Sequence, residues 1–225
     1  MPGADRYGDR TEAGRALIAP LRVLIDGQAA APVLLALPRG GVPVAVEPAR
    51  ALGLPLGLAM VRKVGLPGQR ELAVGAVAGP GGAVLEINED VAASADLDRG
   101  AIEALAGQAR DEIARRRAAW GKLADPPDLA GRLAVLIDDG LATGATMRAA
   151  IAWARASGAA LVAVAVPVGA PDTVAAMAAR ADAVICPIKP HPFMAVGAHY
   201  ARFDQVAEAE MLSLLAALAK APDAD

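Results

Sequence analysis

The stretch from residue 133 to 146, LAVLIDDGLATGAT, limits the possible folds of this chain more than any other. Four apolar residues at 134–137 predict a short buried strand, and a helix-forming run follows at 147–156. Asp138 and Asp139 come directly after the strand, and glycines and threonines form the turn. A helix N-terminus presents backbone N–H groups and the positive end of the helix dipole, which suits a phosphate. Carboxylates beside it can accept hydrogen bonds from sugar hydroxyls, so the stretch suits a phosphorylated ribose.

A second unit of strand, turn and helix lies earlier in the chain. Residues 33–37 are a continuous apolar run, PRGG follows, and residues 42–52 predict a helix. Arg39, Gly40 and Gly41 would then lie at the carboxyl ends of the strands, where open α/β sheets bind ligands. The glycines let backbone approach a ligand closely, and Arg39 adds a cation. Either turn alone is also compatible with ordinary local turn chemistry, but the two together favour a phosphate site.

The remaining pattern alternates strands with helices. We expect strands at 55–61, 73–78, 84–87, 161–167 and 183–186, and helices at 11–25, 96–122, 172–180 and 206–219. Thr11 would cap the first helix, and residues 1–10 would be loosely held. The alternation predicts one domain with an open, mainly parallel, doubly wound α/β sheet. Residues 83–125 would form an inserted hairpin and long helix, and residues 65–71 a flexible polar loop after Arg62 and Lys63.

Composition excludes several classes of function. The chain has 225 residues, of which 55% are hydrophobic, enough for a sizeable core. A net charge of -3 with interspersed signs offers no basic surface for nucleic acid. One cysteine rules out an intramolecular disulfide, and two histidines leave little for a zinc site. No apolar run spans a bilayer and the N-terminus is no signal peptide, so we expect a soluble, cytoplasmic protein without membrane partners.

Two common nucleotide-binding classes are excluded by their motifs. The chain contains no GxxxxGK[ST] sequence, which a P-loop nucleoside triphosphatase requires. No GxGxxG sequence follows any expected strand, which argues against a dinucleotide-binding enzyme.

The order of four apolar residues, two acids and Thr-Gly-x-Thr resembles the phosphoribosyl-pyrophosphate (PRPP) binding motif of the type I phosphoribosyltransferases. PRGG after the first strand is similar to the family's pyrophosphate loop. The stretch RKVG…REL resembles its flexible catalytic loop, and HPFMAVGAHY lies in a region, 187–205, that resembles its "hood", which holds the nitrogenous base. Together these stretches resemble a bacterial subgroup of phosphoribosyltransferases without a settled substrate.

The resemblance implies a phosphoribosyl transfer of the nucleotide-salvage kind, with PRPP and Mg²⁺. The metal would be held by phosphate oxygens and water rather than directly by protein ligands. The implied PRPP-binding residues are Arg39, Gly40, Gly41, Asp138, Asp139, Ala142, Thr143, Gly144, Ala145 and Thr146. The implied catalytic residues are Arg62, Lys63, Arg70 and Glu71.

The acceptor is left open by the sequence. His191, Phe193 and Tyr200 are weak candidates for binding it, and Phe193 could equally pack the hood onto the sheet. Ala142 occupies a position where the hypoxanthine-guanine type of the family has an acid, so the chain resembles the adenine, orotate and uracil types there. The alternative to an enzyme is a PRPP-binding sensor without turnover, which the cations Arg62 and Lys63 disfavour. A homodimer is one option for the assembly.

Overall fold

A five-stranded parallel sheet forms the centre of the protein in the computed structural model, which describes residues 6–66 and 69–219, with side chains omitted at 69–71. Its strand order is β2-β1-β6-β7-β8. The strands are β1 (Pro32–Ala36), β2 (Leu56–Leu58), β6 (Leu133–Ile137), β7 (Leu161–Ala165) and β8 (Ala183–Ile185). Every residue of β6 is buried, as expected for a parallel strand that is covered on both faces.

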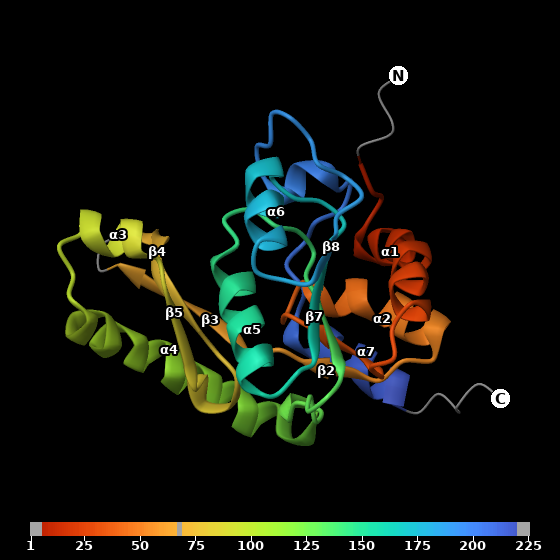
Figure 1. The fold of residues 1–225 in the computed structure, drawn as a ribbon, viewed down its shortest axis with the longest axis horizontal. Helices are drawn as coiled ribbons and strands as arrows, with labels where there is room; N and C mark the ends of the chain where they lie inside the picture. The colour runs from red at the N-terminus through yellow and green to blue at the C-terminus, as the bar shows by residue number, and fades with distance from the viewer. Residues whose placement is uncertain (1–5, 67–68, 220–225) are drawn as a thin grey trace.

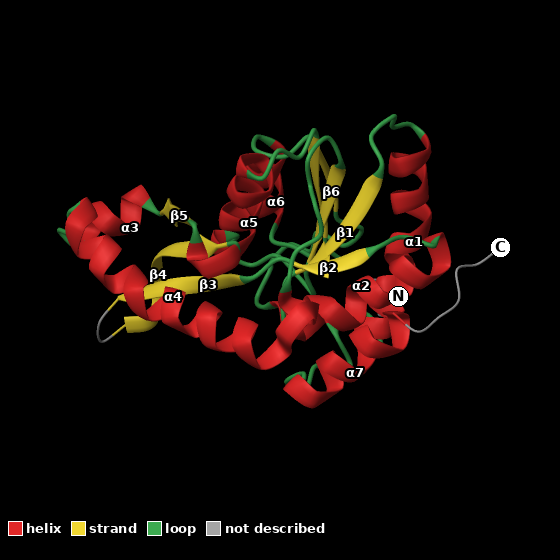
Figure 2. Ribbon diagram, turned by 90° about the horizontal axis from the view of Figure 1, so that it is seen from below, coloured by secondary structure: helices red, strands yellow, loops and turns green. Residues whose placement is uncertain are grey.

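Helices cover both faces of this sheet, because alternate strand residues point to opposite sides (Figures 1 and 2). One face carries α1 (Arg10–Asp26), α2 (Gly41–Leu52) and α7 (Glu208–Ala219), and the other carries α5 (Ala145–Ala156) and α6 (Pro171–Ala178). Val135 and Ile137 pack in the first core, whereas Ala134 and Leu136 pack in the second. The predicted open, doubly wound α/β sheet is confirmed.

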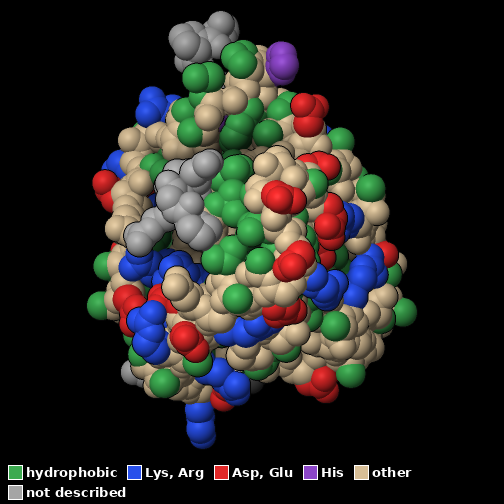
Figure 3. Space-filling view, turned by 90° about the vertical axis from the view of Figure 1, so that its left-hand side faces the viewer, with side chains coloured by type: hydrophobic (Ala, Val, Ile, Leu, Met, Phe, Trp, Pro, Cys, Tyr) green, Lys and Arg blue, Asp and Glu red, His purple; other side chains and the backbone are tan. Residues whose placement is uncertain are grey.

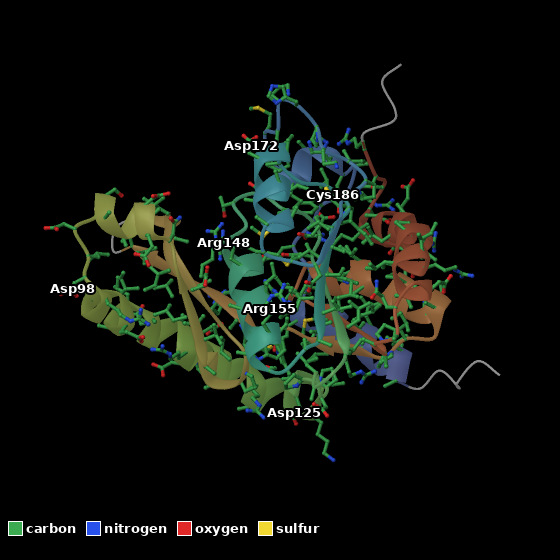
Figure 4. All side chains as sticks on the ribbon, viewed as in Figure 1. Asp98, Asp125, Arg148, Arg155, Asp172 and Cys186 are labelled. Carbon is green, nitrogen blue, oxygen red and sulfur yellow. The ribbon has the colours of Figure 1, made fainter. Side chains whose placement is uncertain are left out.

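A second, antiparallel sheet stands beside the first. It contains β3 (Val61–Leu66), β4 (Gln69–Ala78) and β5 (Val84–Ile87) in that order. The short helix α3 (Glu89–Ser94) and the long helix α4 (Arg99–Trp120) follow. We call residues 61–120 the arm, since they project to one side of the central sheet in Figure 1. Asp98, at the far end of the arm in Figure 4, caps α4 by accepting a hydrogen bond from the Ala101 N–H.

Three sequence predictions about the arm and the strand before it are wrong. The strand expected at 55–61 is two strands in different sheets, because Ala59 and Met60 between them are apolar and buried and give no turn signal. The loop expected at 65–71 instead contains paired strand residues, since Leu66 faces Gln69 across the hairpin, and residues 67–68 lie outside the described part. The long helix begins at Arg99 rather than at 96, after the separate helix α3. The bounds of the predicted 83–125 insertion and of the hood stay predictions.

The segment before α1 is also more ordered than expected. Asp9, not Thr11, caps the helix, because its carboxylate accepts a hydrogen bond from the Glu12 N–H at 3.0 Å. Tyr7 is 8% exposed and forms a parallel bridge with Tyr200 of the hood. The expectation that residues 1–10 are loosely held is therefore wrong for residues 6–10, while residues 1–5 lie outside the described range. Within the described ranges, no helix combines the length and apolarity needed to cross a membrane.

Candidate functional site

The acidic pair lies where β6 ends. The Asp139 N–H donates a hydrogen bond to Asp138 Oδ1 at 2.9 Å. Burial raises the pKa of Asp138 well above its ordinary value, and the Asp139 carboxylate acts in the same direction, while Arg10 and Lys63 oppose it. Burial also raises the pKa of Asp139, against the effect of the Arg10 guanidinium. Hydrogen-bond donors from a ligand would favour the ionised forms of both groups, and sugar hydroxyls are such donors.

The turn after the acidic pair leads into α5 without a side-chain cap. Gly144 precedes the helix in the left-handed conformation, with φ of 73°, and no side chain caps the first turn. The N–H groups of a first helical turn lack intrahelical partners, so an anion could accept hydrogen bonds there. Ala142 and Thr143 are exposed beside these groups. Thr146 is in the first turn of the helix, so its hydroxyl is carried by the same element.

The PRGG turn lies against the acidic pair. The two turns are neighbours because β1 and β6 pair in parallel, and the Leu37 N–H donates to the Ile137 carbonyl at 2.8 Å. A Cβ atom at Gly40 would stand 2.1 Å from Asp139 Oδ2, and one at Gly41 would stand 2.5 Å from the Ile137 carbonyl oxygen. Both glycines are therefore required by close approach rather than by a special φ. Arg39 precedes them, and its peptide bond to Pro38 is cis.

The two cations of β3 point to opposite faces of the strand. Val61 packs with α5 and Val64 packs with α4, so by alternation Lys63 lies on the α5 face and Arg62 on the α4 face. Burial and the charge of Arg116 lower the pKa of Arg62. Lys63 acts electrostatically on Asp138. Arg39 of the PRGG turn also acts electrostatically on Arg62, so the catalytic roles of Arg62 and Lys63 stay predictions.

Five predicted site residues remain: Arg70 and Glu71 of β4, and His191, Phe193 and Tyr200 of the hood, of which Tyr200 contacts the acidic pair through a hydrogen bond to the Asp139 carbonyl. The side chains of Arg70 and Glu71 are not among those described. His191 is exposed at the edge of the hood, while Phe193 stacks on His199 with ring centroids 6.0 Å apart. Tyr200 is only 1% exposed, so in this conformation its ring offers no open face to a ligand.

Arg10 is the main residue of the site that the sequence did not indicate. Its Nε donates to Asp139 Oδ2 at 2.8 Å, and both side chains are largely buried. Arg10 is the first residue of α1, where an arginine normally extends into solvent, and no local pattern marks its partner. It lines a cavity of about 390 Å³ together with Arg39, Gly40, Asp139, Val196, Phe203, Gln205 and Val206.

Two further side chains, also unmarked by the sequence, fix the loop before α5. Thr173 Oγ1 donates to the Ala142 carbonyl at 2.6 Å, and Arg148 Nη1 donates to the Thr143 carbonyl at 3.1 Å. Arg148 extends from the start of α5 toward the arm in Figure 4. Both contacts hold carbonyl groups and so leave the N–H groups of the loop to a ligand.

The phosphoribosyl transferase domain family matches residues 11–201 of this chain. The chain belongs to the type I phosphoribosyltransferase family. Two Mycobacterium tuberculosis proteins, named "Putative phosphoribosyl transferase MT0597" and "Putative phosphoribosyl transferase Rv0571c", are each 45% identical to it over 209 residues, or 93% of this chain. The chain spans 46% of the length of these curated relatives. The crystal structure of TT1426 from Thermus thermophilus is 40% identical, covers 93% of this chain and 97% of that one, and has a TM-score of 0.78.

The structure brings together the residues that are predicted to bind PRPP. The residues that are predicted to bind the acceptor lie farther apart. The acidic pair, the PRGG turn and the turn before α5 meet at the ends of the neighbouring strands β1 and β6. The candidate acceptor residues are spread over the hood, from exposed His191 to buried Tyr200. Figure 3 shows acidic and basic side chains interspersed over the face nearest the arm, without a large area of one sign.

Proposed function

We propose that this protein transfers the 5-phosphoribosyl group of PRPP to a nitrogenous base or another small nucleophile and releases pyrophosphate. The observation that carries the proposal is the contact between the two turns, in which Gly40 lies directly against the Asp139 carboxylate. Ribose hydroxyls on Asp138 and Asp139, a 5-phosphate at residues 142–146 and a pyrophosphate at PRGG would then belong to one donor molecule.

The reaction needs positioning and charge rather than a protein nucleophile. The bond from C1 of the ribose to pyrophosphate breaks as positive charge builds on the sugar ring, and the acceptor forms a bond to C1. Correct placement of the two reactants can lower the barrier by about 7–11 kcal/mol in favourable cases. Arg39 beside the pyrophosphate position and Lys63 on the facing strand would stabilise the leaving group electrostatically. Arg62, Arg70 and Glu71 stay proposed catalytic residues.

The donor set fits a magnesium ion that arrives with the substrate. Among residues 6–66 and 69–219 no group of three or more His, Cys, Asp or Glu side chains could hold a metal. Mg²⁺ usually keeps several waters and binds substrate phosphates rather than an all-protein cage, so we expect the pyrophosphate of PRPP and water to hold it. When bound, Mg²⁺ would neutralise charge on the pyrophosphate.

The cavity of about 390 Å³ between the PRGG turn and the hood is the proposed acceptor region. It is within the size range of small-molecule sites. Its lining combines the arginines with Phe203 and the amide of Gln205. His191, Phe193 and Tyr200 stay candidates for contacts with the acceptor if the hood moves on binding.

The test combines donor binding with an acceptor screen. We expect PRPP with Mg²⁺ to raise the thermal unfolding temperature of the purified protein, and at least one purine, pyrimidine or small amine to cause pyrophosphate release. The double variant Asp138→Asn/Asp139→Asn should lose this stabilisation, whereas Asp125→Asn, in an exposed ion pair with Arg117, should keep it. Stabilisation without turnover on any acceptor would support a PRPP sensor instead, and no stabilisation at all would refute both functions.

A further inference from the structure

Arg10 makes three different contacts around the acidic pair. Its Nε donates to Asp139 Oδ2 at 2.8 Å, and its Nη1 donates to the Asp204 carbonyl at 2.8 Å. Its guanidinium carbon lies 3.9 Å from the centroid of the Phe203 ring, which is cation–π geometry. Arg10 belongs to α1, Asp139 to the end of β6, and Phe203 and Asp204 to the hood. One side chain therefore joins three parts of the chain at the donor site.

Asp139 is held from three sides. Arg10 binds Oδ2, and Gly40 packs so closely that any side chain there would overlap the carboxylate. The Tyr200 hydroxyl donates to the Asp139 main-chain carbonyl at 2.6 Å. With Oδ2 taken by Arg10, Oδ1 is the oxygen left to meet a sugar hydroxyl. The orientation of this carboxylate is thus set before any ligand binds.

The Arg10–Asp139 pair differs from a similar pair on the same helix. Arg15 Nε donates to Glu47 Oε2 at 2.9 Å, but the Arg15 side chain is 65% exposed, and Glu47, itself 15% exposed, keeps Arg50 as a second partner at 3.2 Å. Arg10 and Asp139 are 12% and 16% exposed. Exposed ion pairs contribute little to stability or geometry, whereas removing one partner of a buried pair leaves a charge without compensation. Arg15 is therefore a matched control for Arg10.

We propose that Arg10 is a positioning residue of the donor site, which holds the Asp139 carboxylate in place for a ribose hydroxyl and ties it to the hood through Phe203 and Asp204. The proposal rests on the proposed phosphoribosyl transfer. Without Arg10, Asp139 would face the Asp138 carboxylate with less positive charge nearby.

The proposal has a pH signature. Arg10 lowers the pKa of Asp139 against the effect of burial, so its loss raises that pKa further. Ligand binding that needs ionised Asp139 would then weaken at a higher pH as the solution is acidified. The other charged or titratable groups around the acidic pair are Asp138 on β6, Lys63 on β3, Arg39 beside the cavity and Tyr200 in the hood. Arg10 also lowers the pKa of Asp138 and of Tyr200, so its substitution would raise these two pKa values as well, and Asp139 must be followed by its own signal.

The experiment compares Arg10→Gln, Arg10→Lys and Arg15→Gln. Binding of PRPP with Mg²⁺ is measured by calorimetry between about pH 4.5 and 8, and the carboxyl carbon shift of Asp139 is followed by NMR in the unliganded protein. We expect Arg10→Gln to weaken PRPP binding by about 10- to 100-fold. It should also move the acid limb of binding and the Asp139 pKa upward, and raise KM for PRPP more than it lowers kcat.

The lysine variant keeps the charge without the planar fork, so we expect a smaller loss and a smaller pKa rise. Arg10→Lys also tests the proposal if Arg10→Gln fails to fold. Arg15→Gln should match the wild type in every measurement. An unchanged Asp139 pKa in the Arg10 variants, or equal losses for Arg10 and Arg15 variants, would overturn the positioning role whatever the wild type binds. Absence of PRPP binding by the wild type would instead refute the proposed function, which separates the two failures.

Discussion

The central sheet and the arm differ in how their strands are buried. In β6 all five residues are buried, while in β3 Arg62 and Lys63 are exposed between buried neighbours. The parallel strands of the centre are covered on both faces, so they carry polar side chains only beyond their ends. The antiparallel arm strand carries its cations within the strand itself. The donor turns thus follow strands that are buried on both faces, whereas Lys63 acts on Asp138 from an exposed position within β3.

This difference has a consequence for mutational tolerance. In the central sheet, the turn residue Gly41 lies against the backbone of the neighbouring strand β6, so a larger side chain there would clash. In the arm, a Cβ at Gly107 of α4 would meet no atom within 4 Å, and Arg62 and Lys63 of β3 are exposed, so these positions have room for substitution. The three predictions below test this contrast, in order of decreasing expected effect.

Gly41→Val should have the largest effect, because a Cβ there would stand 2.5 Å from the Ile137 carbonyl oxygen and backbone must move. We expect the free energy of unfolding to fall by roughly 2–4 kcal/mol and stabilisation by PRPP to disappear. Chemical denaturation with and without PRPP measures both. If the variant has the stability and the PRPP response of the wild type, the PRGG turn can accommodate a side chain. The turns of the central sheet would then be no less tolerant of substitution than the arm.

Lys63→Ala should affect turnover more than folding. The side chain is exposed on β3 and acts electrostatically on Asp138, so we expect kcat to fall about 10- to 100-fold with a smaller change in KM for PRPP. Steady-state kinetics with the acceptor found in the screen measures this. Lys122→Ala, an exposed lysine beyond the end of α4, is the control and should behave as the wild type. Equal kinetics for both variants would remove Lys63 from the proposed catalytic residues.

Gly107→Ala should have the smallest effect and the opposite sign. Gly107 is inside α4, and a Cβ there would meet no atom within 4 Å. Alanine favours a helix over glycine, so we expect the free energy of unfolding to rise by about 0.4–1 kcal/mol with unchanged kcat. Thermal and denaturant unfolding measure the change. A loss of stability would mean that the arm is packed as tightly at this helix as the turns of the central sheet.

The central sheet could be predicted because its core strands are continuous apolar runs that are followed by turn residues. The runs before PRGG and before Asp138 have this form, and both became neighbouring strands. The donor turns followed from the same local signals. The entry to the arm could not be predicted, because residues 56–61 stay apolar while the chain passes from one sheet to the other.

Hydrogen bonds between distant side chains could not be predicted from one sequence. Arg10 and Asp139 are 129 residues apart, and neither neighbourhood carries a pattern that points to the other. Tyr200 attracted attention as an aromatic residue of the hood, but nothing local indicated that its hydroxyl would bind the Asp139 carbonyl. The identity of the acceptor and the formation of a homodimer stay open for the same reason. Both depend on surfaces that residues from distant parts of the sequence form together.

The bridge between Tyr7 and Tyr200 has a consequence for the order of assembly. It joins residues 193 positions apart in sequence, and the ion pair of Arg10 lies directly beside it. Contacts of such long sequence separation form slowly, because the chain must close a large loop before they can form. During synthesis α1 leaves the ribosome long before the hood. Donor binding would therefore report that folding is complete, and a chain that stops short of residue 200 would keep Arg10 beside Asp139 but lack the Tyr200 hydrogen bond and the contacts of Arg10 with the hood.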